Sequence, residues 1–137
     1  MVNLILIVNG IYDLLCACSI LFFSHIPVVG LLSKLHPSMF SDMEDINNPI
    51  IRRLLAYWLA TYGTVRLAAG CHPSCDLIIV ATLTYFLEGI CFEYECIIGQ
   101  SMVPRKAKLV SVLSGILGLV CLLDVTNWNY KIFLFLT

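Results

Sequence analysis

Four long apolar stretches constrain the fold of this chain more than any other feature of its sequence. They cover residues 4–23, 50–69, 77–98 and 109–125. A helix needs about 20 apolar residues to cross the hydrocarbon layer of a bilayer, so the last stretch is close to the short limit. Strands of alternating polarity, which a membrane barrel requires, do not appear. The sequence therefore predicts an all-α polytopic membrane protein, with residues 1–137 forming one four-transmembrane-helix bundle.

The composition agrees with a lipid environment and limits the possible functions. Hydrophobic residues make up 60% of the chain and charged residues only 12%, whereas soluble domains are usually about a quarter charged. The net charge of −1 and the lack of a basic face argue against nucleic-acid binding. No phosphate-binding loop, catalytic motif or metal-ligand pattern is present. We therefore expect no enzyme activity, no cofactor and no metal.

The segments between these stretches predict the topology. Residues 70–76 form a short turn, which makes the second and third helices antiparallel. Both termini are predicted to be lumenal or external, because basic residues concentrate on the opposite, cytoplasmic side. Trp128 and Tyr130 are typical of the membrane–water boundary and predict a short interfacial segment at the C-terminus. The basic residues on the cytoplasmic side are Lys34, Arg52, Arg53, Arg105, Lys106 and Lys108.

Ionisable residues within the apolar stretches are the first candidates for a site, because a charge in lipid costs several kcal/mol unless it is paired. Asn9 and Asp13 share one face of the first helix. Arg66 and Glu88 lie at depths in the second and third helices that would let both reach Asp13. These residues form either a buried polar cluster or ligand-binding site, or an arrangement in which Arg66 extends to the membrane surface while the acids are protonated.

Glu88 and Glu95 fall on one stripe of the third helix, with Phe92 between them. Such an acidic stripe could line a path for protons or cations. The fourth helix offers only Ser111 and Ser114 opposite it. A conducting role therefore stays an alternative to the others.

Small residues predict where helices approach one another closely, because they let backbones touch in lipid. They serve either the packing of this bundle or the docking of another membrane protein. These candidates are Ala56, Ala60 and Gly63 in the second helix and Ser111, Gly115 and Gly118 in the fourth.

Cys71 and Cys75 flank the turn between the second and third helices, on the predicted lumenal side. A disulfide between them is possible there, and free thiols are an equal alternative. Their spacing differs from that of thioredoxin-type pairs, and no second Cys or His pair stands nearby to complete a zinc site. A membrane thiol oxidoreductase is thus a minor hypothesis.

The second and third helices resemble the eukaryotic ergosterol-biosynthesis scaffold family of four-helix membrane proteins. That family has an Arg, a Trp five residues later and another Arg eight beyond, and Arg53, Trp58 and Arg66 stand at these spacings. Its third helix contains His-Phe-x-x-Glu, of which Phe92 and Glu95 are present here, with cysteine in place of the histidine. The resemblance covers roughly residues 50–108, and the opening Asn-Gly-Ile-Tyr run resembles DoxX-like four-helix proteins.

The resemblance implies a non-catalytic protein of the endoplasmic reticulum that tethers sterol-modifying enzymes. Three functions are consistent with the sequence. The first is a scaffold or small subunit that binds other integral membrane proteins, with a homo-oligomer as a further form of assembly. The second is a protein that binds a membrane lipid or sterol-like ligand beside Asn9, Asp13, Arg66 and Glu88. The third is an ion or proton pathway.

Overall fold

The computed structural model is helical and describes residues 2–22, 37–40 and 48–136, with side chains described up to residue 126. The long helices are α1 (Val2–Phe22), α4 (Pro49–Cys71), α5 (Cys75–Tyr94) and α6 (Pro104–Leu136). Two short elements accompany them, the 3₁₀ turn η1 (Pro37–Met39) and the π-helical turn η2 (Glu95–Gly99). The described residues contain no strand, only an isolated bridge between Phe40 and Met102. The predicted all-α class is confirmed.

Three of these helices are long and apolar enough to cross a membrane: Val2–Phe22, Cys75–Gly99 and Pro104–Thr126. The chain is thus a multi-pass membrane protein. The prediction of four such spans is only partly confirmed. The helix α4 is long enough to cross a membrane, but its mean hydropathy is too low for it to count as a candidate span. The physical reason is its composition, because arginine, tyrosine, threonine and glycine interrupt its apolar residues.

Local signals in the sequence explain where the middle helices begin. Asn48 caps α4 by accepting a hydrogen bond from the backbone N–H of Ile50 at 2.9 Å, and Pro49 suits the first helical position. Ser74 caps α5 by accepting from the N–H of Leu77 at 3.3 Å. Only residues 72–74 separate α4 from α5, and so short a connection makes these helices antiparallel, as predicted.

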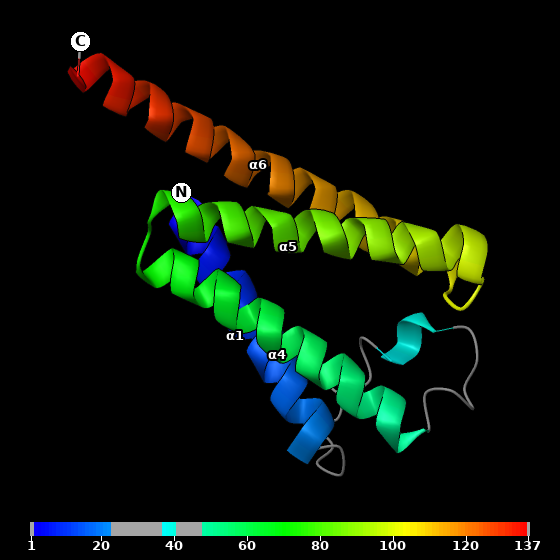
Figure 1. Ribbon diagram of the computed structural model, residues 1–137. Coiled ribbons are helices and arrows are strands. Elements are labelled where there is room, and N and C mark those ends of the chain that lie inside the picture. Colours follow the sequence, from blue (N-terminus) through cyan, green and yellow to red (C-terminus); the bar gives the residue numbers. More distant parts are fainter. Residues whose placement is uncertain (1, 23–36, 41–47, 137) are drawn as a thin grey trace.

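The last helix differs from its predicted bounds of residues 109–125. It begins at Pro104 and continues without a break to Leu136. The predicted end rested on the polar residues after Val125, but no glycine or proline follows Gly118 to stop the helix. The final turns of α6 project beyond the other helices (Figure 1). The interfacial position of this segment stays a prediction.

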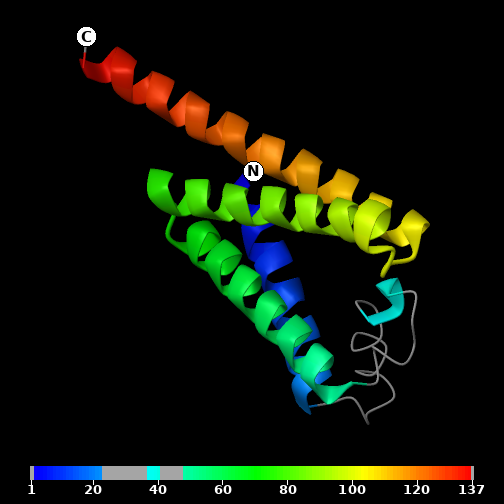
Figure 2. The same cartoon turned by 45° about the vertical axis from the view of Figure 1, so that its right-hand side comes forward.

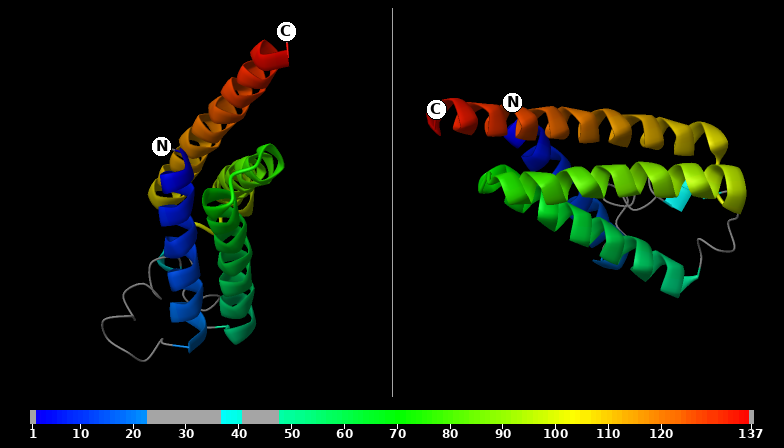
Figure 3. Two further views of the ribbon diagram at one scale, coloured as in Figure 1. Left: turned by 90° about the vertical axis from the view of Figure 1, so that its left-hand side faces the viewer. Right: turned by 45° about the horizontal axis from the view of Figure 1, so that its top comes forward.

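The helices form two antiparallel pairs, α1 with α4 and α5 with α6 (Figure 1). All four contribute to one core near the turn at residues 72–74, where Leu6, Ala69, Tyr85 and Cys121 are fully buried. From that end α4 and α5 diverge, and η1 lies near their separated ends (Figure 2). In the right-hand view of Figure 3, α4 moves away from α5 toward the end of the helix pair at which η1 lies.

Glycine brings the backbones of α1 and α4 into contact. A Cβ atom added to Gly10 would lie 2.6 Å from the backbone nitrogen of Leu67 and 2.8 Å from the carbonyl oxygen of Gly63. Ala56 is buried on the same face of α4, and Ala60 is partly buried beside it. The small residues predicted in the second helix therefore pack within this bundle.

The small residues predicted in the fourth helix have different surroundings. Ser111 donates a hydrogen bond to the carbonyl oxygen of Gly89 at 3.0 Å, and Gly118 lies against the ring of Phe86. By contrast, a Cβ atom on Gly115 would meet no described atom within 4 Å. Ser111 and Gly118 thus serve packing between α5 and α6. At Gly115, by contrast, no described residue lies where a side chain would project.

We expect Gly10→Ala to destabilise the protein by about 1–3 kcal/mol, because its methyl group would collide with backbone atoms that cannot rotate away. Thermal unfolding of the protein in lipid nanodiscs measures this loss. Gly115→Ala is the matched control and should unfold within about 1 kcal/mol of the wild type. Equal unfolding temperatures for both variants would contradict the close contact between α1 and α4.

Candidate functional site

Arg66 lies on the packed face of α4 rather than on its lipid-facing side. The buried residues of this helix recur at intervals of three or four, as Ala56, Leu59, Gly63, Arg66 and Gly70. This register turns Arg66 toward α1 and α5, and only 2% of its side chain is exposed. The alternative in which Arg66 extends to the membrane surface is therefore not the observed arrangement.

The guanidinium of Arg66 joins three helices. Its Nη1 lies 2.7 Å from Oδ2 of Asp13 on α1, and its Nη2 lies 2.6 Å from Oε2 of Glu88 on α5. Its Nε donates to the hydroxyl of Thr84, also on α5, at 3.2 Å. The planar fork of arginine suits such simultaneous bonds, which a lysine could not reproduce. The structure thus brings together the three ionisable residues predicted to meet.

Aromatic rings surround the same guanidinium. Its central carbon lies 3.9 Å from the ring centre of Tyr85 and 5.3 Å from that of Tyr62, distances at which a ring attracts a cation. The Tyr85 hydroxyl accepts a hydrogen bond from Nδ2 of Asn9 at 3.0 Å. Asn9 therefore belongs to the cluster through Tyr85 rather than through the ion pairs.

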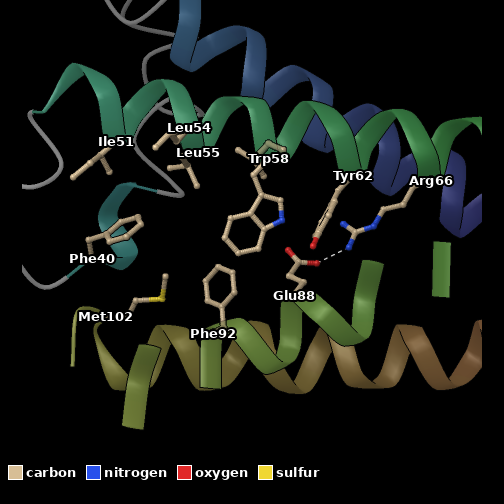
Figure 4. A pocket seen from close by; sticks show the side chains of 11 residues that line it. Phe40, Ile51, Leu54, Leu55, Trp58, Tyr62, Arg66, Glu88, Phe92 and Met102 are labelled. Atoms are coloured by element: carbon tan, nitrogen blue, oxygen red, sulfur yellow. Dashed lines mark hydrogen bonds and ion pairs between the residues drawn. The ribbon is translucent and has the colours of Figure 1, made fainter. Parts of the chain in front are cut away.

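An apolar cavity of about 190 Å³ lies between α4 and α5 and reaches these ion pairs at one end. Figure 4 shows Trp58 and Tyr62 projecting into it from α4, opposite Phe92 and Glu88 from α5. The remaining wall is aliphatic or aromatic. Besides these residues and Arg66, the lining consists of Phe40, Ile51, Leu54, Leu55, Leu59 and Met102.

The turn η1 and the start of α6 close the end of the cavity opposite the ion pairs. The backbone N–H of Val103 donates to the carbonyl oxygen of Met39 at 2.7 Å, and Nζ of Lys106 donates to the carbonyl oxygen of Ser38 at 2.8 Å. These bonds hold Phe40 and Met102 against the cavity (Figure 4). Residues 37–40, which lie between α1 and α4 in the sequence, thus contribute Phe40 directly to the site.

Glu95 does not join the cluster around Arg66. Its Oε2 accepts a hydrogen bond from the hydroxyl of Ser101 at 2.7 Å, beside the π-helical turn. Phe92, which separates it from Glu88 along the helix, is buried. The two acids of the predicted stripe therefore have separate partners, and the proton-pathway hypothesis gains no support from the described residues.

The predicted cysteine pair lies at the turn between α4 and α5. Cys71 is exposed and Cys75 is partly buried, and the structure records both as thiols. Within residues 2–22, 37–40 and 48–136, no group of His, Cys, Asp or Glu side chains is arranged to hold a metal ion. The described part of the chain thus offers the cavity as its clearest candidate site.

Several residues of this site are not among those that the sequence predicts. Thr84 and Tyr85 complete the cluster, and Trp58 and Tyr62 form the aromatic wall. One pattern in the sequence could have indicated the aromatic wall: Trp58, Tyr62 and Arg66 recur every four residues and therefore share one face of α4. The cavity itself depends on the divergence of α4 from α5, which no sequence pattern gives.

No protein-family model, curated protein or solved structure matches this chain. The resemblance to the ergosterol-biosynthesis scaffold family therefore stays a prediction.

We expect Arg66→Ala to destabilise the protein by about 3–5 kcal/mol, because it leaves the buried Asp13 and the partly buried Glu88 without their cation. Thermal unfolding in nanodiscs measures the loss. Arg53→Ala is the control, since Arg53 is exposed and, among the described residues, bonds to the carbonyl oxygen of Pro49 in its own helix and to no acid. An Arg66 variant as stable as the Arg53 variant would show that these ion pairs do not hold the helices together.

Proposed function

We propose that this protein binds a small amphipathic lipid, such as a sterol-like molecule, in the cavity between α4 and α5. The single observation that carries the proposal is an apolar, aromatic-lined cavity that reaches a buried charged group inside a membrane protein. Ligand sites combine mostly apolar walls with a few placed polar groups that fix orientation. This cavity has that composition, with Glu88 and Arg66 as its polar end.

The size of the cavity limits what it can enclose. An engineered cavity of about 150 Å³ in another protein admits benzene, so about 190 Å³ is enough for one ring or a short chain segment. A larger lipid would place only one end here. Its remainder would extend past Leu54, which lines the cavity and is 61% exposed, into the surrounding hydrocarbon.

The proposal includes the position of the cavity within the bilayer. We infer that α4 also crosses the membrane, because it lies antiparallel to α1 and its buried arginine is paired. The termini would then be lumenal or external, with the endoplasmic reticulum as the favoured membrane. In that arrangement Arg66 and Glu88 lie within the hydrocarbon layer, where only an amphipathic molecule already dissolved in lipid would reach them.

Tethering of other integral membrane proteins is a second candidate function, favoured by one observation on α6. Gly115 has open space at its side-chain position, and the neighbouring Val112, Ile116 and Leu119 are more than half exposed. A partner helix could approach closely at such a glycine. Crosslinked partners that Gly115→Leu removes and a blocked cavity does not would assign the function to this face.

Filling the cavity tests the first proposal. We expect Ile51→Trp to abolish retention of a copurifying lipid, because Ile51 lines the cavity and a larger side chain would occupy its volume. Native mass spectrometry in mild detergent measures the bound lipid. Leu83→Trp is the matched control, since Leu83 on α5 is 53% exposed and does not line the cavity. Equal lipid retention in both variants, or none in the wild type, would contradict the proposal.

A further inference from the structure

Glu88 is the point where the charged cluster meets the cavity. Its Oε2 bonds to Arg66, whereas its Oε1 has no hydrogen bond or ion pair with any residue that the structure describes. In Figure 4 this second oxygen points away from Arg66, on the side of the cavity where Trp58 lies. The Glu88 side chain as a whole is only 13% exposed. Glu88 therefore offers one hydrogen-bond acceptor on a largely buried side chain to an occupant.

The charges of the cluster do not balance. Asp13 and Glu88 contribute two carboxylates, and Arg66 contributes one guanidinium. All three kinds of nitrogen in that guanidinium already have partners, in Asp13, Glu88 and Thr84. With both acids ionised, the cluster carries one excess negative charge in a region of low dielectric, which a second cation would stabilise.

The walls beside Glu88 suit a cation as well as an apolar group. The ring centres of Trp58 and Tyr62 lie 5.6 Å apart with their planes nearly perpendicular, and Phe92 lies 6.3 Å from Trp58. The faces of such rings attract ammonium groups, most strongly when water is excluded. Among the described residues that line the cavity there is no lysine, and the arginine, Arg66, is already bonded. The described residues thus supply the acceptor and the rings but no cation between them.

We propose that the ligand of this cavity is a cationic amphiphile, whose protonated amine lies beside Oε1 of Glu88 while its apolar body extends toward Ile51 and Met102. This inference rests on the proposed function, because it specifies the chemical class of the same ligand. An anionic head group is disfavoured, because it would face the carboxylate of Glu88, while each nitrogen of Arg66 already bonds to Asp13, Glu88 or Thr84. A neutral alcohol could also donate to Oε1 but would leave the charge of the cluster unbalanced.

Two probes with one carbon skeleton separate these ligands, 4-phenylbutylamine and 4-phenylbutanol. Each carries one aromatic ring, which matches the volume of the cavity. Trp128→Phe leaves Trp58 as the only tryptophan, so its fluorescence in phosphatidylcholine nanodiscs reports occupation of the site. We expect the amine to bind at least about 10-fold more tightly than the alcohol, as one added charge interaction would give.

Glu88→Gln, made in the same background, should weaken binding of the amine by about 10-fold and change that of the alcohol by no more than about twofold. Retained binding of the alcohol shows that this variant is folded. Glu93→Gln is the matched control, because Glu93 lies on α5 but does not line the cavity. This control should keep the amine preference, which separates binding in the cavity from adsorption of a cation to the protein surface.

Other outcomes overturn the inference in distinguishable ways. Equal affinity for amine and alcohol, with both lost in Ile51→Trp, would reject the cationic ligand and leave the proposed function standing. An amine preference that Glu88→Gln does not reduce would place the recognition elsewhere and reject the inference too. Absence of binding by either probe, together with a wild type that retains no lipid, would reject both the inference and the proposed function.

Discussion

The guanidinium of Arg66, held between Asp13 on α1 and Glu88 on α5, is the interaction on which the rest of the structure depends. In lipid, helices gain little from burying apolar side chains against one another, because hydrocarbon surrounds them in either case. A charge in that medium has to be paired, and the partners of Arg66 come from two other helices. The ion pairs therefore fix which faces of α1, α4 and α5 meet.

This constraint and the glycine contact act together to produce the cavity. Gly10 and Gly63 let the backbones of α1 and α4 touch, which brings Asp13 within hydrogen-bond distance of Arg66. On the other side, α5 is joined to α4 by a short turn and by Glu88, and beyond that point the two helices diverge (Figure 2). Aromatic side chains line the resulting space without filling it. The same carboxylate thus holds the bundle together and forms the polar end of the candidate site.

The sequence predicted those features that depend on one helix at a time. Apolar length located the helices, and depth along each helix placed Asp13, Arg66 and Glu88 where they could meet. Features that depend on the angle between helices could not be predicted in this way, which is why the cavity and the open side of Gly115 were not foreseen. The helix α6 also continues past the apolar stretch predicted for it, because no glycine or proline follows the polar residues after Val125 to stop it.

The central claim is that Arg66 is required because its two acidic partners are largely removed from solvent, and a neutral triple variant tests this most directly. Thermal unfolding in nanodiscs should be compared for Arg66→Met alone and for Arg66→Met combined with Asp13→Asn and Glu88→Gln. Neutral side chains of similar volume remove the unpaired charges, so the triple variant should recover most of the stability that the single variant loses. A triple variant that is as unstable as the single one would contradict the account.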